Sequence, residues 1–373
     1  VFSPVTSSLE KMTLKATVTY DADEYKADNT AYADAKVVDS DVPMPASFSS
    51  SKDEAANKLT MTWSTPKAVN KRVTEDFEQY DSWAINQFGD WTTYTGKKGN
   101  TTGGWWATYG MPFPHEGENY TYIVFNPEAI QPGITSQNSS IAPRSGEKCL
   151  MSMYSRDGRT YYDTDDWLIS PMLSGEAQTI LFWANNGQPD MTNVRYPQTI
   201  EVLYSDKTAD HADFKKLSTF TQSGGKWNSF TAELPDGANY FAIRCTTKEA
   251  DAFCMLLDDV YYYAGYGKLK GYNVYRNDEL IATLPADATS TTVTFDPNAE
   301  ATRYSVSAVY AGGESTAAYD EACQTDIHNV TIDAQHPADV YTVDGRLVRK
   351  NATSLAQLPK GIYVVNGKKI VKK

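Results

Sequence analysis

The predicted fold rests on three short acidic segments: Asp76-Phe77-Glu78, Asp165-Asp166-Trp167-Leu168-Ile169-Ser170-Pro171 and Leu256-Leu257-Asp258-Asp259-Val260-Tyr261. Each segment is predicted to be a short apolar strand with carboxylates at its edge or end. Carboxylates that are close in space but far apart in sequence either repel one another or share a cation. Sites made only of oxygen ligands favour calcium. The three segments therefore define a central region, residues 75–265, around which the rest of the chain is organised.

Further apolar, aromatic-rich stretches in this region are also predicted to be strands. Clusters of Gly, Pro, Asn and Asp separate them, and the stretches lack helical periodicity. Many short strands of this kind indicate an all-β, double-sheet jelly roll. The stretches are 149–154, 178–183, 199–204, 227–230 and 240–245.

The central region resembles a known family, the cleaved-adhesin or choice-of-anchor-J domains. These are MAM-like jelly rolls found in gingipain-type proteases and in surface proteins of Bacteroidota. The resemblance implies a jelly-roll domain over residues 73–265 that binds rather than cleaves. Its motifs are Asp76-Phe77-Glu78, Phe125-Asn126-Pro127, 165–171, 201–205, 240–245 and Leu257-Asp258-Asp259-Val260.

The segments on either side of this region predict a second β-sandwich. Residues 43–68, which include Trp63, resemble the first two strands of a fibronectin type III module, and residues 266–322 resemble the strands that follow. We expect one discontinuous module with the jelly roll inserted between its second and third strands. Such an insertion is tolerated because the two ends of a surface loop lie close together. The alternative is a degenerate first module and a separate second one.

Residues 1–42 are expected to be a partial fibronectin type III-like segment. Tyr20 and Glu24 repeat the spacing of Tyr310 and Glu314, which belong to the last strands of the module described above. The first segment therefore resembles the end of a fold that recurs later in the chain.

Residues 325–373 are predicted to form a small β-domain with a hairpin turn at Asp344-Gly345. Its Gly-Ile-Tyr-Val-Val stretch and Lys-rich end resemble the C-terminal sorting domain of the type IX secretion route. That resemblance implies export and display at the cell surface, in association with the outer membrane.

Composition limits the partners of the chain. Its 373 residues are 41% hydrophobic and 12% aromatic, with 25 Tyr, which suits sizeable β-cores. The net charge of -13, without a basic stripe, argues against nucleic acid as a partner. No apolar run approaches the ~20 residues of a membrane span. The chain begins at Val1 without a signal peptide, so we expect a mature or trimmed fragment.

The family resemblance implies a structural Ca²⁺ site. A carboxylate from the opening strand and one from the closing strand share the ion in the family. The matching positions are Glu78 and Asp258, with Asp76 and Asp259 as neighbours. Calcium takes about six to eight oxygen ligands, so backbone carbonyls or waters would complete the site. The alternative is ordinary solvated carboxylates at strand edges.

One segment departs from the family pattern. Relatives carry an acidic loop after the position of Thr92, whereas here Tyr94-Thr95-Gly96-Lys97-Lys98 follows, which argues against a second metal site. Asp165 and Asp166 are expected to form and cap a turn before the next strand, rather than to bind metal.

Catalysis is not expected. The four histidines lie in no recognisable nucleophile or metal motif, and the Gly-x-Ser-x-Gly, His-Glu-x-x-His and phosphate-loop patterns are absent from the sequence. Cys245 and Cys254 either form a disulfide across a hairpin or are two buried thiols.

A binding face is expected at Trp105, Trp106 and Tyr109, which lie beside glycines in a connecting segment. Exposed aromatic rings suit stacking on sugars or contact with proteins, while buried rings would only cap the sandwich. The chain is therefore interpreted as a secreted or cell-surface, non-catalytic, adhesin-like protein that binds a host protein or a glycan. The alternative is an accessory, substrate- or carbohydrate-binding region of a secreted peptidase or glycan-degrading system.

Overall fold

The computed structural model describes residues 11–17, 30–36, 41–101, 114–115, 117–130, 139–188, 196–296, 302–325, 337–365 and 368–372. The chain divides into two units. We call Ala68–Leu269 with Tyr310–Gly313 the central unit, and Val1–Lys67, Lys270–Val309 and Glu314–Lys373 the flanking unit. No helix among the described residues is long and apolar enough to cross a membrane.

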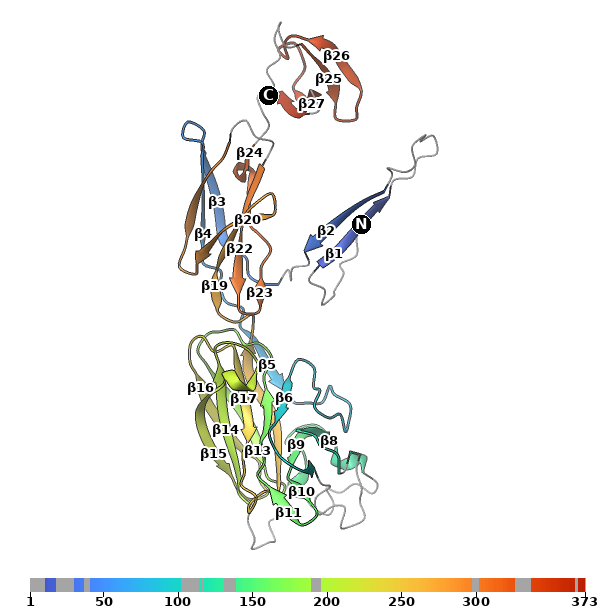
Figure 1. The fold of residues 1–373 in the computed structure, drawn as a ribbon, viewed down its shortest axis with the longest axis vertical. Helices are drawn as coiled ribbons and strands as arrows, with labels where there is room; N and C mark the ends of the chain where they lie inside the picture. Colours follow the sequence, from blue (N-terminus) through green and yellow to red (C-terminus); the bar gives the residue numbers. More distant parts are fainter. Residues whose placement is uncertain are drawn as a thin grey trace. The chain divides into compact units, whose positions relative to one another are not determined.

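The central unit contains two antiparallel sheets (Figure 1). The first sheet has five strands in the order β15 (Lys215–Gln222), β14 (Gln198–Ser205), β17 (Tyr240–Cys245), β12 (Asp166–Ile169) and β6 (Thr92–Thr95). The second sheet has the order β16 (Asn228–Leu234), β13 (Gln178–Asn185), β18 (Cys254–Ala264), β9 (Cys149–Met153) and β8 (Ile123–Phe125), and β5 (Lys71–Glu75) also pairs with β18. A small third sheet joins β11 (Thr160–Tyr162), β10 (Ser155–Asp157) and β7 (Asn100–Thr101).

The main core of this unit is built by strands of both large sheets. Side chains alternate along each strand, so Ile180, Phe182 and Ala184 of β13 face the same side and are fully buried. Ile200 and Val202 of β14, from the other sheet, belong to the same apolar cluster. Burial of each Ile, Val or Phe side chain in this cluster contributes about 1.5–3 kcal/mol. The prediction of an all-β sandwich is therefore confirmed.

The opening and closing segments of the central unit are neighbours in the second sheet. Strand β5 pairs antiparallel with β18, and this pairing places Glu75 opposite Val260. The two ends of the region are therefore adjacent in one sheet.

The part of the flanking unit between the two chain ends also contains two sheets. Strand β4 (Lys58–Ser64) lies between β3 (Ala46–Asp53) and β21 (Ser290–Thr294), so segments far apart in sequence share one sheet. The other sheet contains β20 (Glu279–Pro285), β19 (Leu269–Arg276), β22 (Thr302–Tyr310), β23 (Gly313–Glu314) and β24 (Gln324–Thr325). The buried Trp63 contacts Tyr272 across the two sheets, with ring centroids 5.1 Å apart. The boundaries of the discontinuous module, and its fibronectin type III identity, stay predictions.

The two ends of the chain form separate small sheets. Strands β1 (Lys11–Thr17) and β2 (Thr30–Lys36) pair antiparallel. The C-terminal sheet has the order β26 (Leu347–Ala352), β25 (Ala338–Thr342), β27 (Gly361–Val365) and β28 (Lys368–Lys372). Gly345 lies between β25 and β26 with φ +84°, a conformation that favours glycine. The sorting-type role of residues 325–373 stays a prediction, as does the partial-module identity of residues 1–42.

The cysteines resolve the alternative left open by the sequence. Cys149, Cys245, Cys254 and Cys323 are all buried free thiols. Cys254 Sγ lies 3.1 Å from the carbonyl oxygen of Asn186, whereas Cys245 Sγ lies 3.5 Å from Thr164 Oγ1. The disulfide alternative for Cys245 and Cys254 is therefore wrong, because the two thiols are bound to different polar partners.

Candidate functional site

Carboxylates of the predicted metal site converge on one connecting segment, residues 144–148. Glu78 Oε1 accepts hydrogen bonds from the backbone N–H groups of Glu147 (2.8 Å) and Lys148 (2.7 Å). Asp258 Oδ2 accepts from the N–H groups of Arg144 (2.9 Å) and Ser145 (3.2 Å). The segment therefore links the opening strand region to the closing strand.

A β-bulge brings both closing carboxylates to this segment. The register between β13 and β18 shifts around Asp259, which has φ +45°. Side chains of successive strand residues normally point to opposite faces, and a bulge re-aims them. Asp259 accordingly pairs with the guanidinium of Arg144 and accepts a hydrogen bond from Ser145 Oγ at 3.1 Å. Arg144 also lies over the Trp183 ring, 4.0 Å from its centroid.

The pKa of Asp258 is raised in the folded chain. Burial and, to a lesser extent, the charge of Asp259 raise the pKa of Asp258 to about 7, although the N–H group of Ser145 opposes the shift. Burial also raises the pKa of the Cys149 thiol, with added contributions from the charges of Asp258 and Glu78. Glu78 and Asp258 are therefore close enough to act electrostatically on the same group.

This shift predicts the pH dependence of stability. The folded pKa of Asp258, about 7, lies above the ordinary aspartate pKa of 3.8, so the folded state binds a proton that the unfolded state has already lost. The free energy of unfolding therefore falls as pH rises through this interval, by about 2–3 kcal/mol between roughly pH 5 and pH 8. Urea unfolding in EDTA measures this change, and Asp258→Asn removes most of it. An unchanged slope in Asp258→Asn would contradict the assignment.

The four predicted metal ligands differ in which other groups their carboxylates already contact. Asp76 Oδ1 accepts from the N–H group of Glu78 at 3.2 Å and so closes a local turn. Asp259 is paired with Arg144. Within the described part of the chain, no group of three or more His, Cys, Asp or Glu side chains is arranged to hold a metal ion. Glu78 and Asp258 remain a two-carboxylate oxygen set of the kind that calcium accepts when other oxygens complete it.

Glu75, which sequence reasoning did not select, is the most heavily bonded carboxylate at this end of the sheet. It is 5% exposed and accepts from the Phe77 N–H group (2.9 Å), the Tyr80 hydroxyl (3.0 Å) and Trp91 Nε1 (3.2 Å). Burial, followed by the charge of Glu75, raises the pKa of Tyr80. Glu75 therefore fixes the turn that presents Asp76 and Glu78. A glutamate directly before an acidic motif carries no separate sequence signal for this role.

A polar hollow lies beside strands β6, β12 and β17 of the first sheet. Its volume is about 360 Å³, and we call it the Arg244 hollow. It is formed where the segment after β6, the segment before β12 and the end of β17 meet, because these strands are adjacent in the sheet. Its lining includes Lys98, Tyr162, Asp163, Asp165, Arg244 and Lys248.

Arg244 is held by acids on both sides and by an aromatic ring. Its Nε donates to Asp165 Oδ1 at 2.7 Å, and its Nη1 donates to Glu201 Oε2 at 3.0 Å. Its guanidinium lies 4.8 Å from the centroid of the Trp167 ring, and Trp167 Nε1 donates to the same Asp165 oxygen. Cation–π contact and charge-assisted hydrogen bonds fix the guanidinium rigidly. The hollow therefore presents a preorganised charged group.

A buried ion pair lies next to this network. Lys97 Nζ and Asp166 Oδ2 are 2.9 Å apart, and both side chains are 0% exposed. Ser152 Oγ also donates to Asp166 Oδ2, at 2.6 Å. Burial raises the pKa of Asp166, and the charge of Lys97 opposes that rise. The expectation that Asp165 and Asp166 form and cap a turn is wrong for Asp166, which lies in β12 and whose buried carboxylate requires a partner that Lys97 supplies. The half-exposed Asp165 pairs with Arg244.

Further aromatic side chains pack around Trp167, the ring that contacts Arg244. Tyr94 stacks on His211, with centroids 3.6 Å apart and planes at 7°, and Trp167 packs edge-on against Phe214. His211 belongs to η4 (His211–Asp213), which follows β14. The aromatic residues selected from sequence, Trp105, Trp106 and Tyr109, lie outside the described residues, so their role as a binding face stays a prediction.

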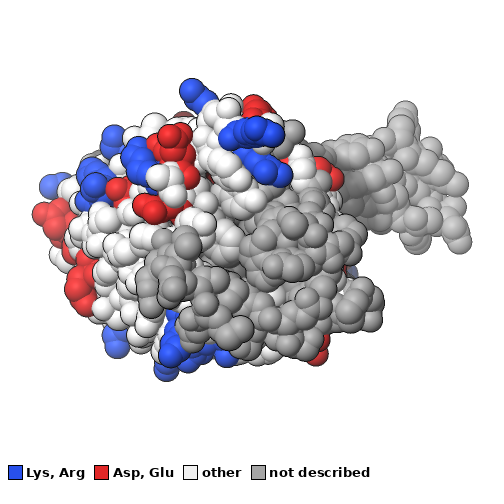
Figure 2. All heavy atoms as spheres, turned by 90° about the horizontal axis from the view of Figure 1, so that it is seen from below, with Lys and Arg blue, Asp and Glu red and all other residues white. Residues whose placement is uncertain are grey.

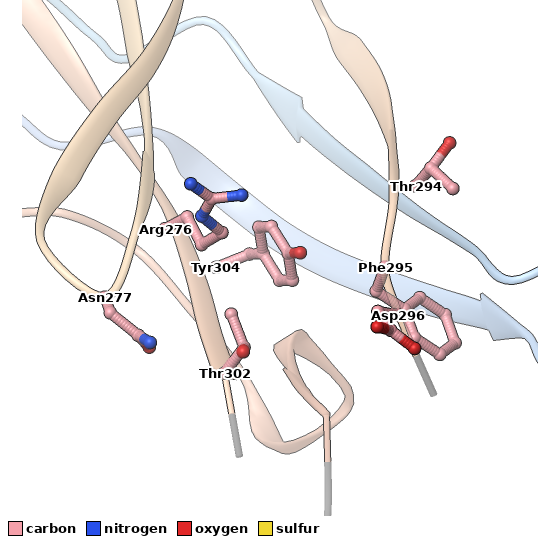
Figure 3. Close-up of a pocket in the computed structure, with 7 residues that line it drawn as sticks. All are labelled: Arg276, Asn277, Thr294, Phe295, Asp296, Thr302 and Tyr304. Carbon is pink, nitrogen blue, oxygen red and sulfur yellow. The ribbon is translucent and has the colours of Figure 1, made fainter. Parts of the chain in front are cut away.

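The flanking unit carries a separate hollow of about 510 Å³. Figure 3 shows Arg276, Tyr304 and Thr302 on one side of it and Phe295 with Asp296 on the other. Arg276 pairs with Glu279 at 3.1 Å, so its charge is partly satisfied outside the hollow. On the face drawn in Figure 2, basic and acidic side chains are intermingled over the described surface.

The fold defines the class of the chain, an all-β sandwich protein. The chain is homologous to two proteins of Porphyromonas gingivalis. It is 26% identical to Lys-gingipain W83 over 247 residues, which cover 56% of this chain and 14% of that protein. It is 28% identical to Hemagglutinin A over 245 residues, which cover 56% of this chain and 11% of that protein. The predicted resemblance to gingipain-type adhesin regions is thus confirmed.

Solved structures align with about half of the chain. The K2 cleaved adhesin domain of Lys-gingipain covers 51% of this chain and 98% of its own, with 19% identity and a TM-score of 0.35. The CBM22-2 xylan-binding domain from Paenibacillus barcinonensis covers 52% and 99%, with 13% identity and a TM-score of 0.30. No family model matches the chain. The chain spans less than a fifth of the length of either curated relative. The activities of those longer proteins are therefore not assigned to this chain.

Proposed function

We propose that the chain is a non-catalytic, extracellular or cell-surface binding protein, and that its central unit recognises a host protein or glycan at the Arg244 hollow. The observation that carries this proposal is the guanidinium of Arg244. It is fixed between Asp165 and Glu201 and over Trp167, at the wall of a hollow of ligand-binding size. Preorganised polar groups bind a ligand without losing side-chain entropy.

The comparisons support a binding role in general terms. One relative is named a hemagglutinin, and the solved structures are named as an adhesin domain and a xylan-binding domain. The resemblance to a sorting-type C-terminal domain supports the surface location, in association with the outer membrane.

A second candidate function follows from the match to Lys-gingipain, whose name denotes a protease. In this alternative the chain is the accessory, substrate- or carbohydrate-binding region of a secreted peptidase or glycan-degrading system. The two functions differ in their target. A surface adhesin retains an unmodified host glycan or matrix protein, whereas an accessory region binds the substrate of an enzyme encoded with it.

The test is a screen of the chain against arrays of glycans and of host matrix proteins, in Ca²⁺ and again in EDTA. We expect at least one specific ligand, with binding weakened by about tenfold or more in Arg244→Lys. Lysine keeps the charge but loses the two-sided hydrogen bonding and the stacking on Trp167. Trp105→Ala with Trp106→Ala tests the alternative binding face in the same screen. The absence of any ligand on both arrays would contradict the proposed function.

We also propose that Glu78 and Asp258 hold a structural Ca²⁺ together with backbone or water oxygens. Excess Ca²⁺ should raise the Tm of the chain by about 5 °C or more, because an ion that binds only the folded state stabilises it. Asp258→Asn should abolish the rise, whereas Asp81→Asn, an exposed position, should retain it. Scanning calorimetry in Ca²⁺, Mg²⁺ and EDTA measures the effect. Equal Tm values in Ca²⁺ and EDTA would show that the hydrogen bonds from residues 144–148 satisfy these carboxylates without metal.

A further inference from the structure

We infer that the Arg244 hollow selects an uncharged, polyhydroxylated ligand, the neutral terminal unit of a glycan, over an acidic glycan. This inference rests on the proposed function and adds the chemical class of the ligand. It follows from how the charges of the hollow are already paired.

Three of the four cations that line the hollow have acidic partners, and the fourth, the exposed Lys98, shares the lining with the acidic Glu249. Lys97 pairs with Asp166 at 2.9 Å, Arg244 with Asp165 at 2.7 Å, and Lys248 with Asp163 at 2.6 Å. An anionic ligand would have to displace one of these carboxylates or lie close to it. Like charges brought together at a binding site disfavour the complex. A sialylated, sulfated or uronic ligand is therefore disfavoured.

The same paired groups retain hydrogen-bonding capacity. A guanidinium has five N–H donors, and Arg244 uses one for Asp165 and one for Glu201. The ammonium of Lys248 has three donors and gives one to Asp163. Each paired carboxylate keeps further acceptor positions. Sugar hydroxyls donate and accept at once, so they can bridge such donors and acceptors without adding charge.

One wall of the hollow is an aromatic ring held in place by glycine. The Tyr162 hydroxyl donates to Asp157 Oδ2 at 3.2 Å, and the ring packs on Gly99, where an added Cβ would lie 2.8 Å from it. Gly99 has φ +71°, so a larger residue would be strained there as well as crowded. A fixed tyrosine face suits the apolar C–H face of a sugar ring. The volume of about 360 Å³ lies at the small end of ligand sites and fits a terminal unit.

Gly96 supplies a variant that changes the hollow with little effect on the fold. An added Cβ at position 96 would collide with the Asp165 carboxylate, the mobile end of a side chain, while φ at Gly96 lies outside the left-handed region. Gly96→Ala therefore moves Asp165 away from Arg244. Lys71→Gln removes an exposed charge of the central unit outside the lining and leaves that pair intact.

The test uses matched pairs of oligosaccharides in titration calorimetry: N-acetyllactosamine with its sialylated derivative, and xylotetraose with its glucuronosylated derivative. We expect one neutral member to bind at least about tenfold more tightly than its acidic partner. Its Kd should be unchanged between about 0.05 and 0.5 M salt, weakened about tenfold in Gly96→Ala and unaffected in Lys71→Gln.

The outcomes separate this inference from the proposed function. Tighter binding of an acidic member, with affinity that falls as salt rises, would overturn the neutral class and keep the hollow as a binding site. A protein-only hit on the arrays would likewise overturn the inference and keep a binding role. No hit on any array would overturn the proposed function itself.

Discussion

Lys97→Met should be among the most destabilising substitutions in the chain, lowering the free energy of unfolding by about 3–5 kcal/mol. Methionine fills a similar volume but leaves the carboxylate of Asp166 without its cation in a site that is 0% exposed. The remaining partners are neutral hydroxyls, including that of Ser152 at 2.6 Å, which cannot neutralise a charge. A fall in Tm of about 10 °C should accompany the change.

The neighbouring residue provides the matched control for this prediction. Lys98 is exposed, so Lys98→Met should change stability by no more than about 0.5 kcal/mol. Adding Asp166→Leu to Lys97→Met should recover most of the loss, because an apolar pair can replace a buried ion pair. Urea unfolding of the wild type, Lys97→Met, Asp166→Leu and the double variant measures the coupling. Additive effects of the two substitutions would contradict the pairing.

Glu75→Ala should produce the second large effect, a loss of about 3 kcal/mol or more. The substitution removes the acceptor for the Phe77 N–H group, the Tyr80 hydroxyl and Trp91 Nε1 in a buried setting. Each buried donor left without a partner costs about 1–3 kcal/mol. Chemical unfolding measures the loss, and the fluorescence of Trp91 reports the change around its indole.

Two variants separate the hydrogen bonds of Glu75 from its charge. Glu75→Gln keeps a carbonyl acceptor and should lose about half as much stability as Glu75→Ala. Asp81→Ala, at an exposed position close in sequence, should be nearly neutral. A Glu75→Ala protein as stable as the Asp81→Ala protein would contradict the role assigned to Glu75.

The layout of the central unit was predictable because its signals are local. Strand residues such as Ile180, Phe182 and Ala184 alternate with half-exposed ones, and this period of two is visible in sequence. The ordered acidic motifs at both ends also matched a known family. The resemblance thus anticipated the contact between β5 and β18, which no local pattern specifies.

The Arg244 hollow was not predictable in the same way. Lys97, Asp165 and Arg244 come from three segments that meet only because β6, β12 and β17 are adjacent in one sheet. Strand order depends on long-range packing, which residue propensities do not encode. In the sequence, the lysines after Tyr94 indicate only a departure from the acidic loop of the resembled family. In the folded chain, Lys97 neutralises the buried carboxylate of Asp166.

The predicted metal ligands were only partly distinguishable from sequence. Glu78, Asp258 and Asp259 all contact residues 144–148, a segment with no acidic motif that would have marked it. The bulge at Asp259 decides which carboxylates face this segment. A bulge depends on the pairing of β13 with β18, so its effect on side-chain direction appears only in the folded chain.

The most direct test of a binding site at the Arg244 hollow is the affinity of the tightest array ligand for Gly96→Ala and for the wild type. The proposed function predicts a loss of affinity of about tenfold or more in the variant, with Tm unchanged within about 2 °C. Equal affinity in both proteins, with the variant folded, would contradict the placement of the ligand in this hollow.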